Sequence, residues 1–103
     1  MTDVDKHREW QFSNYCQEMQ AAETIASILW EADDMPWDFY FDLARHCHDE
    51  VRHSQMGIER LADLGKSVFD YPQVVGNFAW RQLMDPVRRY CTLTYVIEQD
   101  AFK

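Results

Sequence analysis

Two acidic residues and a histidine stand at spacings that suit a metal site. Glu50 and His53 form a Glu-x-x-His sequence within a long stretch of helical patterning, and Glu23 belongs to the patterned stretch before it. Residues three apart on a helix project from neighbouring points of one face, so Glu50 and His53 can reach one cation together. A carboxylate on a core-facing helix stripe is costly to bury unless a cation neutralises it. The pattern predicts half of the ligand set of a carboxylate-bridged two-metal site in a four-helix bundle.

A third acid strengthens this prediction, because a lone Glu-x-x-His is common by chance. Glu23, Glu50 and Glu98 each take the place of an apolar residue in a regular helical stripe, which solvation does not explain. Oxygen ligands with one imidazole suit iron or manganese better than structural zinc, which favours cysteine and histidine. Rival ligands lie close by, since His46 is four residues before Glu50 and Asp49 is four before His53.

Three helices must position these residues, and no strand pattern is present. We expect an all-α fold in a single domain over residues 1–103, with helices at about 5–32, 36–64 and 86–102. Asp33 or Asp34 is the expected N-terminal cap of the second helix, and Gly65 its expected left-handed end. The expected buried stripe of the first helix consists of Tyr15, Cys16, Met19, Ala22, Ala26, Leu29 and Trp30. That of the second consists of Tyr40, Leu43, Ala44, Cys47, Val51, Ser54, Ile58 and Leu61.

The helices are joined by a loop over residues 66–77, where Tyr71-Pro72 and Gly76-Asn77 are turn signals. A short helix is expected over residues 78–84. Asp85-Pro86 then opens the third long helix with a cap followed by proline. The antiparallel pairing of the first two long helices would bring Glu23 and Glu50 together.

The overall charge narrows the classes of partner. The chain of 103 residues has a formal net charge of −8, which disfavours binding to nucleic acid or to an anionic membrane. No apolar run approaches the length of a membrane span, and no signal-peptide pattern is found, so we expect a cytoplasmic protein. Cys16, Cys47 and Cys91 are expected to be small core residues in a reducing compartment.

The residues around the Glu-x-x-His sequence resemble the ferritin-like superfamily of di-metal carboxylate proteins. The segments that carry the resemblance are Glu18-Met-Gln-Ala-Ala-Glu23 and Asp49-Glu50-Val-Arg-His53. Two further segments, Met35-Pro-Trp-Asp-Phe-Tyr40 and Glu59-Arg-Leu-Ala-Asp-Leu-Gly65, are similar to a bacterial ferritin-like family of unassigned function. The resemblance covers roughly residues 8 to 100. It implies that Glu23, Glu50 and His53 are the ligands of one half-site and that Glu98 is the first ligand of the other.

The second half of that motif is missing, because no second Glu-x-x-His follows Glu98. Either the chain is part of a longer four-helix protein, or two chains pair as a homodimer and each supplies Glu23, Glu50 and His53. We favour the homodimer, in which a second chain completes the bundle. If the homodimer forms, Glu98 can instead lie beside the site or at another contact.

The implied function is that of a non-haem di-iron protein, or an iron–manganese protein, that reacts with dioxygen. Two metal ions would act together to oxidise a small-molecule substrate or iron itself. The alternatives are a metal-binding or iron-buffering protein without an organic substrate, and a structural helical oligomer that binds no metal.

Overall fold

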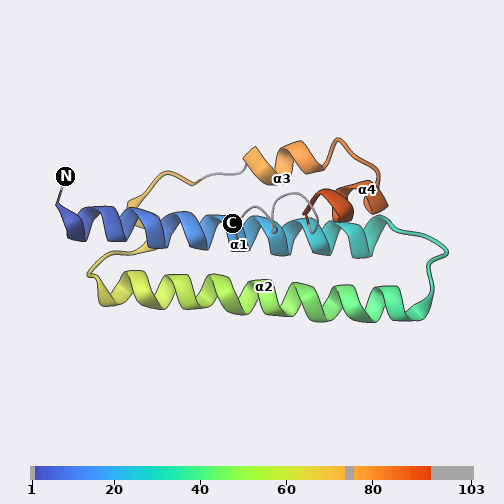
Figure 1. Ribbon diagram of the computed structural model, residues 1–103, viewed down its shortest axis with the longest axis horizontal. Coiled ribbons are helices and arrows are strands. Elements are labelled where there is room, and N and C mark those ends of the chain that lie inside the picture. The colour runs from blue at the N-terminus through green and yellow to red at the C-terminus, as the bar shows by residue number, and fades with distance from the viewer. Residues whose placement is uncertain (1, 74–75, 94–103) are drawn as a thin grey trace.

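The protein is described by a computed structural model that covers residues 2–73 and 76–93, without the side chain of residue 77. Two long helices form an antiparallel pair, α1 (Asp3–Glu31) and α2 (Trp37–Asp63). A 3-10 turn, η1 (Val68–Asp70), and two short helices, α3 (Gly76–Arg81) and α4 (Pro86–Cys91), follow. Figure 1 shows α3 and α4 on the side of α1 that faces away from α2. The described residues contain no strand, so the all-α class is confirmed for them.

The ends of the long helices have identifiable causes. The Thr2 hydroxyl caps α1 by accepting from the Asp5 amide at 3.1 Å. Gly65 has φ +83° just past α2, so the expected left-handed end is confirmed. The expected aspartate cap of α2 is wrong, because Pro36 holds the cap position without a side-chain hydrogen bond. Asp34, one of the two expected cap residues, instead lies in the turn between α1 and α2 and has a positive φ of 56°.

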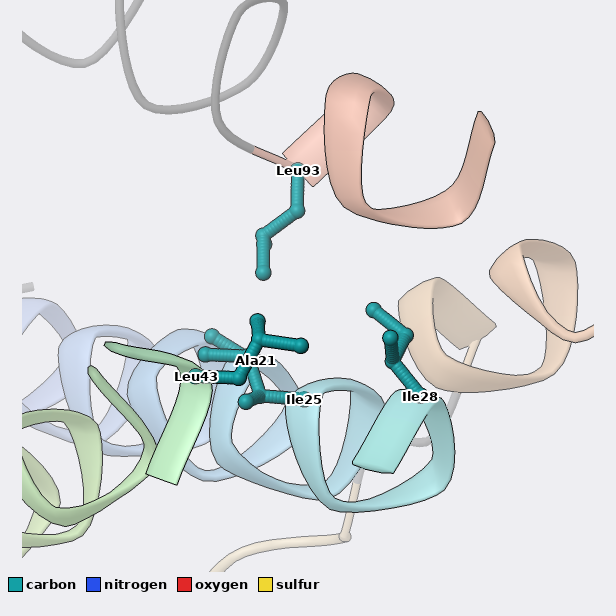
Figure 2. Packing of buried hydrophobic residues seen from close by; sticks show 5 residues of the cluster. All are labelled: Ala21, Ile25, Ile28, Leu43 and Leu93. Carbon is teal, nitrogen blue, oxygen red and sulfur yellow. The ribbon is translucent and has the colours of Figure 1, made fainter. Parts of the chain in front are cut away.

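Two apolar clusters hold α1 and α2 together. One lies toward the loop that joins the helices, where Ile25, Ile28 and Leu43 are almost completely buried and Leu93 reaches them from beyond α4 (Figure 2). The other lies toward the open end of the pair and consists of Phe12, Cys16, Leu61 and Val68. The predicted metal ligands Glu50 and His53 lie between the two clusters.

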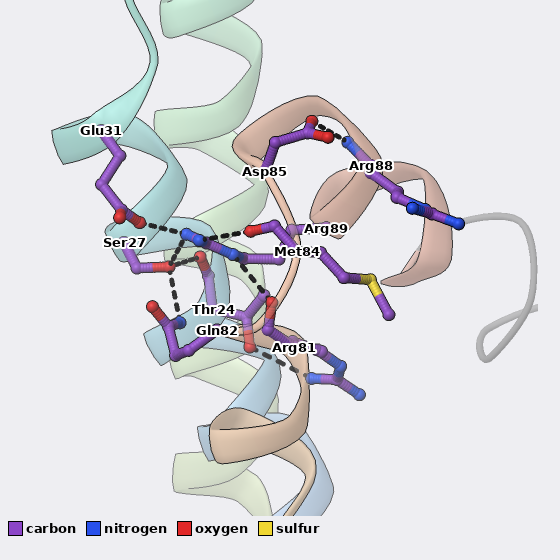
Figure 3. A network of polar contacts seen from close by, with 9 residues as sticks. All are labelled: Thr24, Ser27, Glu31, Arg81, Gln82, Met84, Asp85, Arg88 and Arg89. Atoms are coloured by element: carbon purple, nitrogen blue, oxygen red, sulfur yellow. Dashed lines mark hydrogen bonds and ion pairs between the residues drawn. The ribbon is translucent and has the colours of Figure 1, made fainter.

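A polar network fastens the third layer to α1. Arg89 of α4 is 2% exposed and donates to the carbonyls of Arg81 and Met84, to the Ser27 hydroxyl and to the Glu31 carboxylate (Figure 3). The expected cap at Asp85 is confirmed, since its carboxylate accepts from the Arg88 amide at 3.0 Å. Only residues 86–91 of the helix expected over 86–102 are assigned to α4, and residues 94–102 lie outside the described part.

The buried side of α1 differs from the expected stripe. Cys16 and Ala22 are buried as expected, but Ala26 and Trp30 are exposed, Trp30 by 89%. The reason is that α1 is covered on two sides, by α2 and by the α3–α4 layer, so Gln20 and Thr24 are buried as well. In α2, the core positions Leu43, Ser54 and Leu61 are buried as expected, whereas Ala44, Val51 and Ile58 are exposed.

Two further expectations concern the cysteines and the membrane. None of the three cysteines is in a disulfide; Cys16 is buried, Cys47 is partly buried and Cys91 is exposed, so the core placement of Cys91 is wrong. Within residues 2–73 and 76–93, neither long helix has the apolar character that crossing a bilayer requires.

Candidate metal centre

Glu50 is the centre of the site because it is a buried carboxylate with incomplete hydrogen bonding. It lies in the middle of α2 and is 5% exposed. Its Oε1 atom is 2.9 Å from Nε2 of His46, one turn earlier on the same helix. Its Oε2 atom is buried and has no hydrogen-bond partner among the described residues. A buried carboxylate oxygen without a donor is costly, and a cation would remove that cost.

Glu18 and His53 complete a three-ligand group with Glu50. One ligand atom from each lies within 4.8 Å of the other two, a spread that a single cation can bridge. His53 Nδ1 is 3.7 Å from Glu18 Oε2, across the interface between α1 and α2. The side chain of Glu18 is 35% exposed and that of His53 is 44% exposed, so the group is buried at Glu50 and open on its other side.

The structure brings together only part of the predicted ligand set. Glu50 and His53 lie side by side as expected, and their acidic partner from α1 is Glu18. Glu23 is exposed, so its expected place on the buried stripe is wrong, and it is not part of the group formed by the described residues. Glu23 lies five positions after Glu18, which is about 140° around a helix of 3.6 residues per turn. Glu98 lies outside the described residues.

The sequence contains a signal for Glu18 that the expected stripe left out. Tyr15, Glu18, Ala22, Ile25 and Leu29 follow 3–4–3–4 spacing, and all five are buried or partly buried. The expected stripe lay farther around the helix because Met19, Ala26 and Trp30 are also apolar. The choice between the two stripes depended on where α2 packs, which the local pattern does not encode.

His46 links the site to α4. Its Nδ1 atom is 3.2 Å from the Tyr90 hydroxyl, and its Nε2 atom contacts Glu50. A neutral His46 with its proton on Nε2 can donate to Glu50 and accept from Tyr90. The predicted rival Asp49 faces other groups, since its carboxylate is 3.8 Å from Arg52 and 4.0 Å from His48. His46 therefore orients Glu50, and Asp49 lies among surface charges.

The site has an opening to solvent on its exposed side. A pocket of about 190 Å³ is bordered by Asn14, Glu18, His53, Met56 and Arg60, with Gln11 and Gly57 completing its wall. Gly57 permits the close approach of the helices here, because a Cβ atom on it would lie 3.2 Å from Cβ of Tyr15. The pocket has room for a few water molecules or a small ligand beside Glu18 and His53.

The donor set fits a hard or borderline divalent cation. Two carboxylates and one imidazole are ligands that iron and manganese accept, and Oε2 of Glu50 supplies a buried oxygen without another partner. Three protein ligands leave coordination positions for water or a small molecule, as in catalytic rather than structural metal sites.

Comparisons with protein-family models, with curated proteins and with solved structures give no match for this chain.

Proposed function

We propose that this protein binds iron or manganese through Glu18, Glu50 and His53. The observation that carries the proposal is the unpartnered Oε2 atom of Glu50, buried within reach of a second carboxylate and an imidazole. A cation at this point would neutralise the buried acid and draw Glu18 and His53 together across the helix interface. The assignment of Glu18 as a ligand in place of the predicted Glu23 leaves the donor set of the half-site unchanged, with two carboxylates and one imidazole.

The reaction that we propose is oxidation of a small molecule, or of iron, by dioxygen. The bound metal would supply a redox centre with open coordination positions. The chain contributes the pocket beside Glu18 and His53 as the route for small molecules. The contact of Tyr90 and His46 holds the orientation of the Glu50 carboxylate.

A metal-holding function without an organic substrate is the second candidate. It is favoured by the exposure of His53 and Glu18, because a ligand set open to solvent permits ready exchange of the ion. A third possibility, a metal-free structural oligomer, rests on the His46–Glu50 contact, which partly satisfies the buried carboxylate.

Metal titration separates the first two candidates from the third. Purified chain, freed of metal with a chelator, should gain thermal stability on addition of Mn²⁺ or, without oxygen, Fe²⁺. Glu50→Gln, Glu18→Gln and His53→Ala should each remove most of this gain. The matched controls Glu23→Gln and His48→Ala should keep it, because Glu23 and His48 are exposed and lie outside the three-ligand group. If neither Mn²⁺ nor Fe²⁺ raises the melting temperature, the proposal of metal binding is refuted.

The enzyme and the metal-holding protein differ in the chemistry that comes after metal binding. An oxidase should consume dioxygen in proportion to a product formed from an added organic substrate. A buffer should consume dioxygen only as iron is oxidised.

The sequence also suggested a ferritin-like bundle in which a second chain completes a two-metal site, and this remains part of the proposal. Electron paramagnetic resonance of the Mn²⁺-loaded protein tests it. Two ions held close together couple magnetically and lose the six-line signal of isolated Mn²⁺. A full-intensity six-line signal would indicate one separate ion in each chain.

A further inference from the structure

The side of α2 away from His53 has a row of exposed apolar residues with a regular repeat. Trp37, Ala44, Val51 and Ile58 are seven residues apart, and each of them is exposed. The exposed fractions are 77% for Trp37, 44% for Val51 and 38% for Ile58. Phe41, one turn after Trp37, is 56% exposed and widens the row. A seven-residue apolar repeat is the mark of a helix that packs lengthwise against another helix.

The repeat is not used inside the described part of the chain. The contact with α1 is made by a different set, which includes Leu43, Glu50, Ser54 and Leu61. Val51 is one residue beyond Glu50 and therefore about 100° around the helix from it, whereas His46 and His53 lie on the opposite flank. The exposed row, called here the α2 seam, is thus separate from the proposed metal site.

We propose that the α2 seam is a dimer interface between two copies of this chain, with their α2 helices antiparallel. Steric self-complementarity supports this arrangement. Ala44 and Ile58 are symmetric about Val51, so a two-fold axis near Val51 would place the small side chain of each copy opposite the large one of the other.

Charge complementarity along the edge of the seam supports the same arrangement. Arg45 and Glu59 are symmetric about residue 52. Both are exposed and make no ion pair with the described residues. An antiparallel pair would bring Arg45 near Glu59 of the partner subunit. Arg52, close to the axis, already has Asp49 at 3.8 Å to offset its charge.

An unrelated partner would not require both patterns to be symmetric about nearly the same point in the helix. The α2 seam therefore selects a second copy as its occupant. This dimer does not depend on the proposed metal function. The Glu18–Glu50–His53 group lies away from the α2 seam, so a pairing of chains that completes a two-metal site would use a different face from this one.

A matched pair of valine variants tests the interface. Sedimentation equilibrium over a micromolar to submillimolar range should give a dimer for the natural chain. Val51→Glu should weaken dimerisation at least about tenfold, because it buries a charge at the centre of the seam. Val87→Glu is the control, since Val87 is also on a helix and is 49% exposed, but lies on α4. Circular dichroism should show the same helix content in both variants.

A charge exchange tests the antiparallel arrangement. Arg45→Glu and Glu59→Arg should each weaken the dimer roughly threefold to tenfold, and the double variant should restore it. A monomeric natural chain, or equal effects of Val51→Glu and Val87→Glu, would overturn the proposal and leave the seam to residues 94–103 or to a different protein. A double variant no better than the single ones would overturn the antiparallel arrangement.

Discussion

Two buried charges in this protein are surrounded in opposite ways. Arg89 is 2% exposed, and its Nε and both terminal nitrogens have acceptors on Arg81, Ser27, Met84 and Glu31. Glu50 is 5% exposed and, within residues 2–73 and 76–93, has a hydrogen-bond partner on one oxygen only. The described chain supplies acceptors for the Arg89 guanidinium, whereas Oε2 of Glu50 keeps its lone pairs available for a ligand. Arg89 therefore serves the fold, and the open oxygen of Glu50 agrees with the proposal that this carboxylate holds a metal ion.

The largest expected effect on stability comes from removing the Arg89 guanidinium from its hydrogen-bond network. Arg89→Met preserves most of the side-chain volume but leaves the carbonyls of Arg81 and Met84 without this donor. We expect a loss of about 2–4 kcal/mol in the free energy of unfolding. Urea denaturation followed by circular dichroism measures it. Arg88→Met, on the exposed neighbour, should change stability little; equal effects would mean that the network contributes no stability.

Replacing Glu50 should have the opposite effect on the free energy of unfolding when metal is absent. Glu50→Leu removes an unpartnered buried oxygen, so the chelator-treated variant should be more stable than the natural chain by about 1–3 kcal/mol. The variant should also lose the stabilisation by Mn²⁺. Glu23→Leu, at an exposed acid of α1, is the control. A destabilised Glu50→Leu variant would show that the His46 contact outweighs the missing partner, and the contrast with Arg89 would disappear.

A smaller effect is expected where the helices approach most closely. Gly57→Ala places a methyl group 3.2 Å from Cβ of Tyr15, so α1 and α2 must shift slightly apart. Alanine favours helix by about 1 kcal/mol over glycine, and we expect the steric cost to exceed this gain by about 1 kcal/mol. Mn²⁺ affinity should fall as well, because Glu18 and His53 lie on different helices. Higher stability with unchanged affinity would show that the interface adapts freely.

The smallest expected effect is a difference in thiol reactivity between the region of Glu50 and the region of Arg89. Cys47, one turn before Glu50, has a pKa raised by burial, and its thiol donates to the Ala22 carbonyl at 3.5 Å. Cys91, two residues after Arg89, is exposed. Since the thiolate is the reactive form, a disulfide reagent at mildly alkaline pH should modify Cys91 first and Cys47 more slowly. Mass spectrometry of digested protein identifies the order, and the Cys91→Ser variant should lose the fast phase. Faster modification of Cys47 would contradict its burial.

The long helices could be predicted closely from local signals. Their expected bounds, about 5–32 and 36–64, lie within two residues of α1 and α2, because the apolar spacing along each helix and the turn at Gly65 are encoded locally. The pairing of Glu50 with His53 also depends only on helix geometry. The buried stripe of α1 that faces α2 could not be identified from local spacing, because α1 has buried residues on two sides.

The sequence by itself determined the two long helices and the Glu50–His53 pair, because a spacing of three residues fixes which side chains share a helix face. Only the tertiary structure decided that Glu18, rather than Glu23, joins them, and that His46 and Tyr90 hold Glu50 in place. The physical reason is that these contacts join separate helices, and their choice depends on how α1 is rotated between α2 and the α3–α4 layer. That rotation is set by packing over the whole interface, which no local spacing records.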